Sequence, residues 1–281
     1  EMLQGARISQ AAIEAQKAAL GLDQPFYIQY FVWLSNLLQG NMGYSVKTYQ
    51  SVSAMIGSHL GPTLLLMGVS LIVSLLMAVP AGIYSAIHQY SKGDYTVVTL
   101  SFFGSSIPGF FLSLLLVYLF TVKLGWLPSG GMTTLGSSGG AADIAAHMVM
   151  PVIVLSVSMA GTNIRYIRSA VLEILQQDYL RTARAKGLGR RRVVNQHALR
   201  NAMVPIVTVI GMEIPVLFGG AVIVEQLFSW PGLGLMTMSA IMSRDYPVIM
   251  GVCLLSAVVV LAGNLITDIL YAVVNPTIQY Q

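Results

Sequence analysis

Charged residues are scarce in this chain: Asp, Glu, Lys and Arg make up 9% of its 281 residues, whereas an ordinary soluble domain carries about 25%. So few charges could not keep a water-facing surface soluble, which excludes a typical globular enzyme. Intrinsic disorder is also excluded, because it requires low hydrophobicity and 55% of these residues are hydrophobic. The composition predicts an integral membrane protein.

Cysteine and the common enzyme motifs are nearly absent as well. The single cysteine, Cys253, excludes an internal disulfide and a CxxC metal cluster, and its apolar neighbours predict a small buried hydrophobe. The chain has no GxxxxGK(S/T) phosphate loop, no GxSxG elbow and no HExxH pair. Ser105 and Ser106 lie in GSSIPG, where the Pro-Gly pair indicates a helix kink. We therefore expect no catalytic residue, no metal site and no cofactor bound by this chain.

Five stretches are long and apolar enough to cross a bilayer as helices, since a span needs about 20 mostly apolar residues. They are Leu60–Ile87, Tyr95–Val122, Ile144–Ile164, Asn201–Val224 and Tyr246–Thr267. A barrel strand would instead alternate with a period of two. We predict an all-α, polytopic membrane helix bundle, with an external segment over residues 1–55 and a transmembrane domain over residues 56–281.

Basic residues cluster after the third span, and this clustering predicts the orientation. Nine of the fifteen Lys and Arg residues fall between Arg165 and Arg200, so the positive-inside tendency places this loop in the cytoplasm. The C-terminus is then also cytoplasmic, and residues 1–55 lie outside. Because no signal-peptide pattern carries Glu1 across the membrane, we expect a further span upstream, which would give the full-length protein six.

The external segment contains two candidate helices. Ile8–Leu20 is rich in alanine, and a second helix follows Asp23 and Pro25, carries aromatic and leucine side chains at helical spacing, and stops at Gly40. Aromatic amphipathic helices beside a span lie at the membrane interface. We therefore expect these helices to contact lipid rather than to form a ligand site.

Two carboxylates fall inside or near spans, where a charge is costly unless it is paired, protonated or facing water. Glu213 lies mid-span, two residues before Pro215. Two interpretations stay open for it: a residue of a translocation pathway or its gate, or a structural hydrogen bond to a neighbouring helix. Asp268 lies nearer the inner end of the last span, which favours a structural role at the interface.

The cytoplasmic loop, about residues 171–200, has helices of its own. Glu173–Lys186 is predicted to form a helix that stops at Gly187. Ala183 lies four residues before that glycine, so the two would share one small face able to enter a groove in another protein. The basic residues that flank this face, as donors for an acidic partner, are Arg181, Arg184 and Lys186.

Two other interpretations of the loop are weaker. A bare positive-inside anchor would explain the charges, but not a loop with its own helices and glycine breaker. Nucleic-acid binding is disfavoured, because the basic residues are hardly interleaved with aromatic ones and the loop sits against a membrane.

In this loop the sequence resembles the transmembrane permease subunits of ABC importers in the oligopeptide, dipeptide and nickel group. Their loop follows the pattern D-Y-x-R-T-A-R-A-K-G-L and then H-A-L-R-N-A, which Asp178–Leu188 and His197–Ala202 match. The general importer pattern has a glutamate where Arg181 stands, so the ion pair made by that glutamate is not carried over. Further similar stretches are Gly21–Ser45, Leu124–Gly131 and Ile223–Gly234.

The resemblance implies a non-catalytic half of a translocation pathway in the prokaryotic plasma (inner) membrane. It implies a second, similar permease subunit, two ATPase subunits that use ATP and Mg, and an external binding protein that delivers the substrate. It also implies a coupling helix that docks on the ATPases and tilts the spans. The residues expected in that helix are Arg181, Thr182, Ala183, Arg184, Ala185, Lys186 and Gly187.

The substrate implied by the resemblance is a short peptide, either a dipeptide or an oligopeptide. Nickel, or a peptide-like solute such as glutathione, is the alternative within the group. The sequence disfavours two other classes of membrane protein. An intramembrane hydrolase would need a nucleophile or an acid pair, and the spans offer only isolated Glu213. A passive channel would have no use for a docking loop.

Overall fold

A computed structural model describes residues 23–136, 139–189, 192–198, 201–203, 206–207, 209, 211, 213 and 221–274. Over these residues the chain is helical apart from its loops and an isolated bridge between Tyr44 and Ser51, so the all-α prediction is confirmed. The elements are α2 (Phe26–Leu38), α3 (Val52–Ile87), α4 (Lys92–Ser106), α5 (Gly109–Leu116), the π-helical η1 (Val117–Lys123), α6 (Ala141–Leu175), α7 (Asp178–Ala185), the π-helical η2 (Val193–Ala198), α10 (Val222–Leu227), α11 (Leu233–Met242) and α12 (Tyr246–Val274).

Among the described residues, three helices are long and apolar enough to cross a membrane: α3, α6 and the Tyr246–Thr267 part of α12. They agree with three of the predicted spans. The span predicted over Tyr95–Val122 is not one straight helix, because α4 and the helical stretch Gly109–Lys123 meet at 93°. Pro108 has no N–H and disfavours helical backbone in the preceding residue, so the chain breaks there. The span predicted over Asn201–Val224 lies largely outside the described residues.

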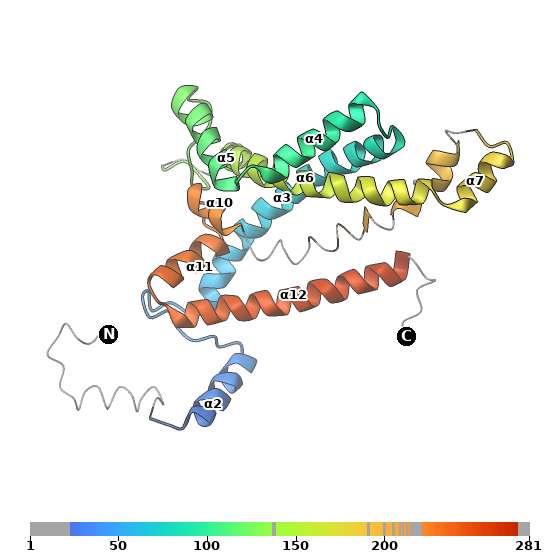
Figure 1. The fold of residues 1–281 in the computed structure, drawn as a ribbon. Coiled ribbons are helices and arrows are strands. Elements are labelled where there is room, and N and C mark those ends of the chain that lie inside the picture. The colour runs from blue at the N-terminus through green and yellow to red at the C-terminus, as the bar shows by residue number, and fades with distance from the viewer. Residues whose placement is uncertain are drawn as a thin grey trace.

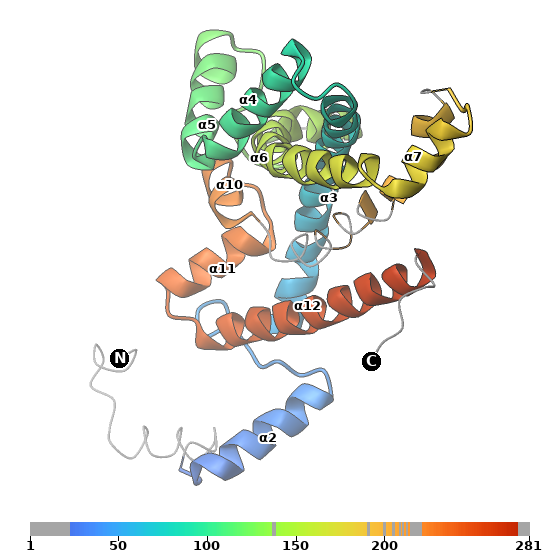
Figure 2. The same ribbon diagram turned by 45° about the vertical axis from the view of Figure 1, so that its right-hand side comes forward.

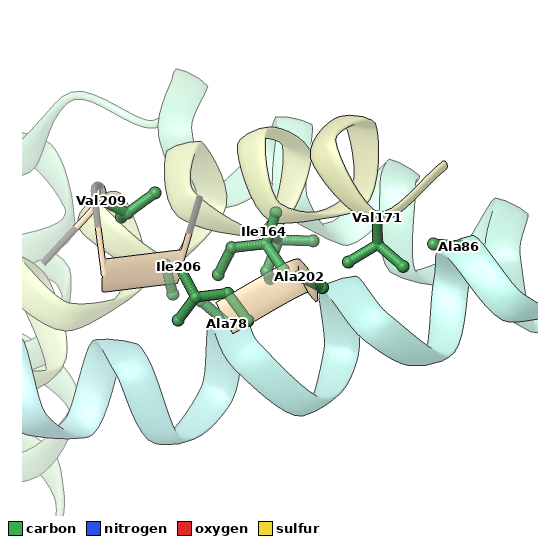
Figure 3. Close-up of a cluster of buried hydrophobic side chains, with 9 residues drawn as sticks. Ala78, Ala86, Ile164, Val171, Ala202, Ile206 and Val209 are labelled. Atoms are coloured by element: carbon green, nitrogen blue, oxygen red, sulfur yellow. The ribbon is translucent and has the colours of Figure 1, made fainter. Parts of the chain in front are cut away.

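Helices α3 and α6 pack side by side and form the centre of the bundle (Figure 1). At Gly82 of α3, an added Cβ would lie 2.9 Å from Ile167 Cγ2 and 3.1 Å from the Ile164 carbonyl oxygen, both on α6. Small residues matter here because lipid gives helices little hydrophobic reason to associate, so close packing must hold them. The buried cluster at this contact, drawn in Figure 3, consists of Ala78, Ala86, Ala160, Ile164, Ile167, Val171, Ala202, Ile206 and Val209.

Helix α4 packs on another side of α6, again through glycine. A Cβ added at Gly161 of α6 would lie 2.5 Å from the Ser101 carbonyl oxygen and 2.8 Å from the Ser105 backbone nitrogen. On α4, a Cβ added at Gly104 would lie 3.0 Å from the Val157 carbonyl oxygen. The two backbones are therefore as close as glycine allows, and α6 is the element on which both α3 and α4 rest.

A buried carboxylate organises the end of the bundle that lies away from α7. Glu225 of α10 is fully buried; its Oε1 accepts a hydrogen bond from Thr63 Oγ1 of α3 at 2.9 Å and its Oε2 accepts one from the Leu235 N–H at 3.0 Å. The Leu233 N–H in turn donates to Thr63 Oγ1 at 2.7 Å. Glu225 thus satisfies the first turn of α11, where a negative charge is favourable, and ties α10 and α11 to α3.

The segment before α3 is fastened by a second buried carboxylate. Asp245, between α11 and α12, accepts hydrogen bonds from the Ser45 hydroxyl and from the Val46 N–H, the latter at 3.1 Å. Helix α2 confirms the second helix predicted in the external segment, and none of its residues is buried. It extends outward from the other helices in both views (Figures 1 and 2), while Trp33 and Leu37 line a pocket together with Leu254 of α12. The predicted helix Ile8–Leu20 lies outside the described residues.

One prediction about α12 is wrong for this chain. Cys253 was expected to be buried, but it is exposed. The reason is that only 17% of the apolar window of α12 is buried inside the chain, so an apolar residue of this helix faces lipid or another subunit as readily as the interior.

The close contact between α6 and α4 can be tested by adding a single methyl group. Gly161→Ala places a Cβ against backbone atoms of α4, which cannot move aside like a side chain, and we expect a loss of about 1–3 kcal/mol in the free energy of unfolding. Thermal denaturation of the purified protein in detergent measures it. The control is Gly68→Ala on α3, where a Cβ would meet nothing within 4 Å; equal melting temperatures for the two variants would contradict the packing.

Candidate functional site

The described residues within 178–198, namely 178–189 and 192–198, form a small helical unit at the end of α6 (Figure 2), which we call the coupling segment. The single helix predicted over Glu173–Lys186 is wrong, because α6 ends at Leu175 and α7 begins at Asp178 after a turn. In this turn the N–H groups of Gln176 and Gln177 bond to carbonyls three residues back. The acidic Asp178 then lies in the first turn of α7, where a negative charge favours a new helix start.

Gly187 ends α7 in a Schellman-type turn. Its φ is +86°, a left-handed conformation that glycine adopts without strain. The Leu188 N–H reaches back to the Ala183 carbonyl oxygen at 3.3 Å, and the two residues belong to the same apolar cluster. Because the helix stops at Ala185, Gly187 does not continue the helical face of Ala183. The predicted small face formed by these two residues is therefore wrong.

An apolar cluster of its own gives the coupling segment its shape. Leu180, Val193 and Ala198 are buried together, and the side chains around them come from the end of α6 and from both sides of Gly187. A hydrogen bond of 2.7 Å from Asn201 Nδ2 to the Tyr179 hydroxyl oxygen lies beside this cluster. The partly buried members of the cluster are Ile174, Leu175, Ala183 and Leu188. The segment is thus packed onto α6 rather than hanging from it as an open loop.

The predicted docking residues divide into two groups. Arg181 is 78% exposed and Asp178 is 95% exposed, with 3.7 Å between Arg181 Nη1 and Asp178 Oδ1; a pair so exposed adds little stability. Ala183 is partly buried within the apolar cluster instead. The other exposed members are Thr182, Ala185, Lys186 and Gly187. The side chain of Arg184 lies outside the described part of the structure.

Glu213, the carboxylate predicted mid-span, has a partner on α6. Asn163 Nδ2 donates to Glu213 Oε1 at 3.2 Å. Asn163 is 4% exposed, so this bond satisfies an amide that would otherwise be buried without a partner. The structural interpretation of Glu213 now has a definite geometry, and its role in a pathway stays a prediction. Asn163 was missed from the sequence, although an amide in the middle of an apolar stretch is the available signal. The Asp268 side chain is not among the described ones.

The geometry gives no support to a hydrolase at the GSSIPG kink. Ser105 Oγ donates to the Phe102 carbonyl oxygen at 3.2 Å and accepts from Arg165 Nη1 at 2.8 Å. A nucleophilic serine requires a base beside its hydroxyl, and here the neighbours are a carbonyl of its own helix and a guanidinium. Within the described residues there is also no group of three His, Cys, Asp or Glu side chains that could hold a metal ion.

Comparisons with known proteins agree with one another. Residues 78–280 match the family described as "Binding-protein-dependent transport system inner membrane component". The oligopeptide transport system permease protein AppB of Bacillus subtilis is 47% identical over 276 residues, which cover 98% of this chain and 87% of AppB. The glutathione transport system permease protein GsiC of Escherichia coli K12 is 38% identical over 280 residues, covering 100% of this chain and 88% of GsiC.

A solved structure has the same fold. A chain of the MetNI methionine ABC transporter, in an inward-facing conformation, superposes with a TM-score of 0.63 at 19% sequence identity, covering 79% of this chain and 96% of that chain. At this identity the similarity is one of fold.

Truncating a buried side chain in the apolar cluster of the coupling segment should lower the local stability of that segment. Leu180→Ala removes the largest buried side chain of the cluster and should cost about 2–5 kcal/mol of local stability, measured as faster hydrogen exchange over residues 178–198. Thr182→Ala, two residues away on the exposed side of α7, is the control and should leave exchange nearly unchanged. Equal exchange in both variants would mean that the segment is not held by this cluster.

Proposed function

The chain belongs to the family of binding-protein-dependent transport system inner membrane components, and we propose that it forms one half of the pathway through which an ATP-driven importer moves short peptides. Its partners in this proposal are a second, similar permease, two ATPase subunits that use ATP and Mg, and an external binding protein. Peptides are favoured because AppB, named an oligopeptide permease, is 47% identical to this chain. Glutathione is the alternative, because GsiC is 38% identical, and nickel remains a further one.

The coupling segment is the observation that carries the proposal. It is a compact unit with its own buried cluster, its polar side is exposed, and it follows directly on α6. Such a packed unit can move as one body, so a displacement caused by another subunit would be transmitted to α6. The exposed Arg181 and Lys186 suit an acidic docking surface. In the proposed topology this segment lies in the cytoplasm and α2 lies on the outer side of the inner membrane.

Transport by this chain would follow from the movement of α6. The helix is 35 residues long and packs against both α3 and α4, so a tilt at the coupling segment would shift both neighbours. The membrane-embedded part of α6 carries Asn163, whose bond to Glu213 joins α6 to the segment after the coupling loop. Reorientation would alter this polar contact within the apolar bundle, which is why Glu213 is proposed to line or gate the pathway.

The test is purification of the full-length protein in mild detergent, followed by identification of the co-purifying subunits and an ATPase assay. The proposal expects a second permease and ATPase subunits, with ATP hydrolysis raised by the binding protein together with di- or tripeptides. Stimulation by glutathione or by nickel alone would identify the alternative substrates. Uptake into proteoliposomes that proceeds without ATP would contradict an ATP-driven importer and support a passive channel.

Two substitutions at Gly187 distinguish the effect of backbone strain on coupling from the effect of side-chain size. Gly187→Val strains the left-handed turn, so we expect the α7 terminus to reorganise and ATP hydrolysis to continue with less uptake per ATP. Gly187→Asn should retain most of the coupling, because asparagine tolerates this conformation and no atom lies within 4 Å of an added Cβ. Uptake per hydrolysed ATP in proteoliposomes is the measurement; equal damage by both substitutions would show that side-chain size decides.

Glu213 can be tested by removing its charge while keeping its hydrogen bond. Glu213→Gln retains an oxygen acceptor for Asn163, so assembly and ATP hydrolysis should stay near normal while uptake falls. Glu213→Leu also removes the acceptor and should reduce the yield of assembled complex, because an unpaired buried amide costs about 1–3 kcal/mol. Unchanged uptake by the glutamine variant would assign Glu213 a structural role alone.

A further inference from the structure

An ion pair with a buried carboxylate and a partly exposed guanidinium, that of Arg168 at 21% exposure, joins three helices near the coupling segment. Asp94, in the first turn of α4, is 2% exposed, and its two carboxylate oxygens accept hydrogen bonds from Arg168 of α6. Arg168 Nε lies 2.8 Å from Oδ1 and Arg168 Nη2 lies 2.9 Å from Oδ2. Such a bidentate pair fixes the relative orientation of the two side chains as well as their distance.

The remaining acceptor capacity of the Asp94 carboxylate is used by the turn between α3 and α4. Ser85, near the end of α3, donates its hydroxyl to Asp94 Oδ1 and accepts from Arg168 Nε at 3.0 Å. The Tyr90 N–H donates to Asp94 Oδ2 at 2.9 Å. The Asp94 N–H donates to Ser91 Oγ at 3.1 Å, which caps α4. Both carboxylate oxygens therefore have two partners each, and the whole turn is bound to one arginine of α6.

The position of this pair along α6 links it to the coupling segment. Arg168 lies about two turns before the end of α6 at Leu175, and α7 starts three residues after that end. In both views the α3–α4 turn and α7 lie towards the same end of the bundle (Figures 1 and 2). Val171, between the pair and the end of α6, is fully buried in the cluster with Ala86 of α3. A displacement of the coupling segment would therefore pass along the last turns of α6, where Arg168 and Val171 contact the α3–α4 turn and the end of α3.

Stability alone does not account for a charged pair at this place. Apolar residues of similar size often replace a buried ion pair without loss of stability, and the surrounding cluster is itself apolar. Apolar contacts can slide past one another, whereas a bidentate pair keeps its partners in register. Arg165, one turn earlier, contacts the Ser101 carbonyl oxygen, the Ser105 hydroxyl and the Phe102 ring of α4, so these partners on α4 are neutral.

We propose that Asp94 and Arg168 are positioning residues that carry movement of the coupling segment from α6 to the α3–α4 turn. This rests on the proposed function as an importer subunit. When the ATPases displace α7, α6 tilts, and the pair makes α3 and α4 follow as one body rather than slip along α6. Loss of the pair leaves ATP hydrolysis in place and disconnects it from the pathway.

The test uses the full complex in proteoliposomes, with the binding protein and labelled trialanine outside and ATP hydrolysis measured in the same sample. The variants are Asp94→Asn, Arg168→Gln and the double variant, which leaves no unpaired buried charge and so guards against misfolding. We expect each, per assembled complex, to import about tenfold less trialanine per ATP hydrolysed, because hydrolysis continues while α3 and α4 no longer follow α6. In the double-mutant cycle the two single changes should not add, because either one already breaks the link.

The control is Lys92→Gln, which removes an exposed charge two residues from Asp94 and should couple normally. A double variant with unchanged uptake per ATP, or uptake that falls only in proportion to the amount of assembled complex, would overturn the positioning role. If the unaltered complex showed no ATP-driven uptake of trialanine, glutathione or nickel, the proposed function would instead be contradicted, and the ion-pair proposal with it.

Discussion

The close packing of α3 against α6 is the constraint on which the rest of the structure depends. Lipid chains are as apolar as the helix surfaces, so association relies on fit rather than on exclusion of water. Gly82 allows the two backbones to meet, and Gly161 does the same for α4 on another side of α6. The outer elements attach to this centre: α10 and α11 through Glu225 and Thr63, and the coupling segment through the end of α6.

Each buried carboxylate among the described residues is fully hydrogen-bonded, because an unpaired charge is especially costly in so apolar a chain. Asp94, Glu225 and Asp245 are each at most 3% exposed and each accepts hydrogen bonds at both carboxylate oxygens. All three lie at turns or short helices between longer helices, where they fix connections that apolar packing alone would leave loose. Glu213 differs because it is only partly buried and has one described partner, Asn163. This difference is what makes Glu213 a candidate for function rather than for architecture.

The sequence predicts those features that depend only on the composition of consecutive residues. Charge-free runs predicted α3, α6 and α12, and aromatic spacing predicted α2, because hydropathy is a property of consecutive residues. Helices within the loop after α6 were also predicted, but their details were not: the turn at Gln176 and Gln177 and the cluster around Leu180 depend on packing against the end of α6. The Asp94–Arg168 pair joins residues 74 positions apart, and Thr63 and Glu225 are 162 apart. Such pairings follow from the tertiary fold, which composition does not specify.

We propose that the coupling segment docks on an ATPase subunit and links ATP hydrolysis to α6. The most direct test is a photocrosslinking amino acid at Thr182, on the exposed side of α7, in the full-length protein within intact membranes. The account predicts an adduct with an ATPase subunit whose yield changes when ATP is bound. Adducts with lipid alone, in membranes where ATP-driven uptake is proceeding, would contradict it.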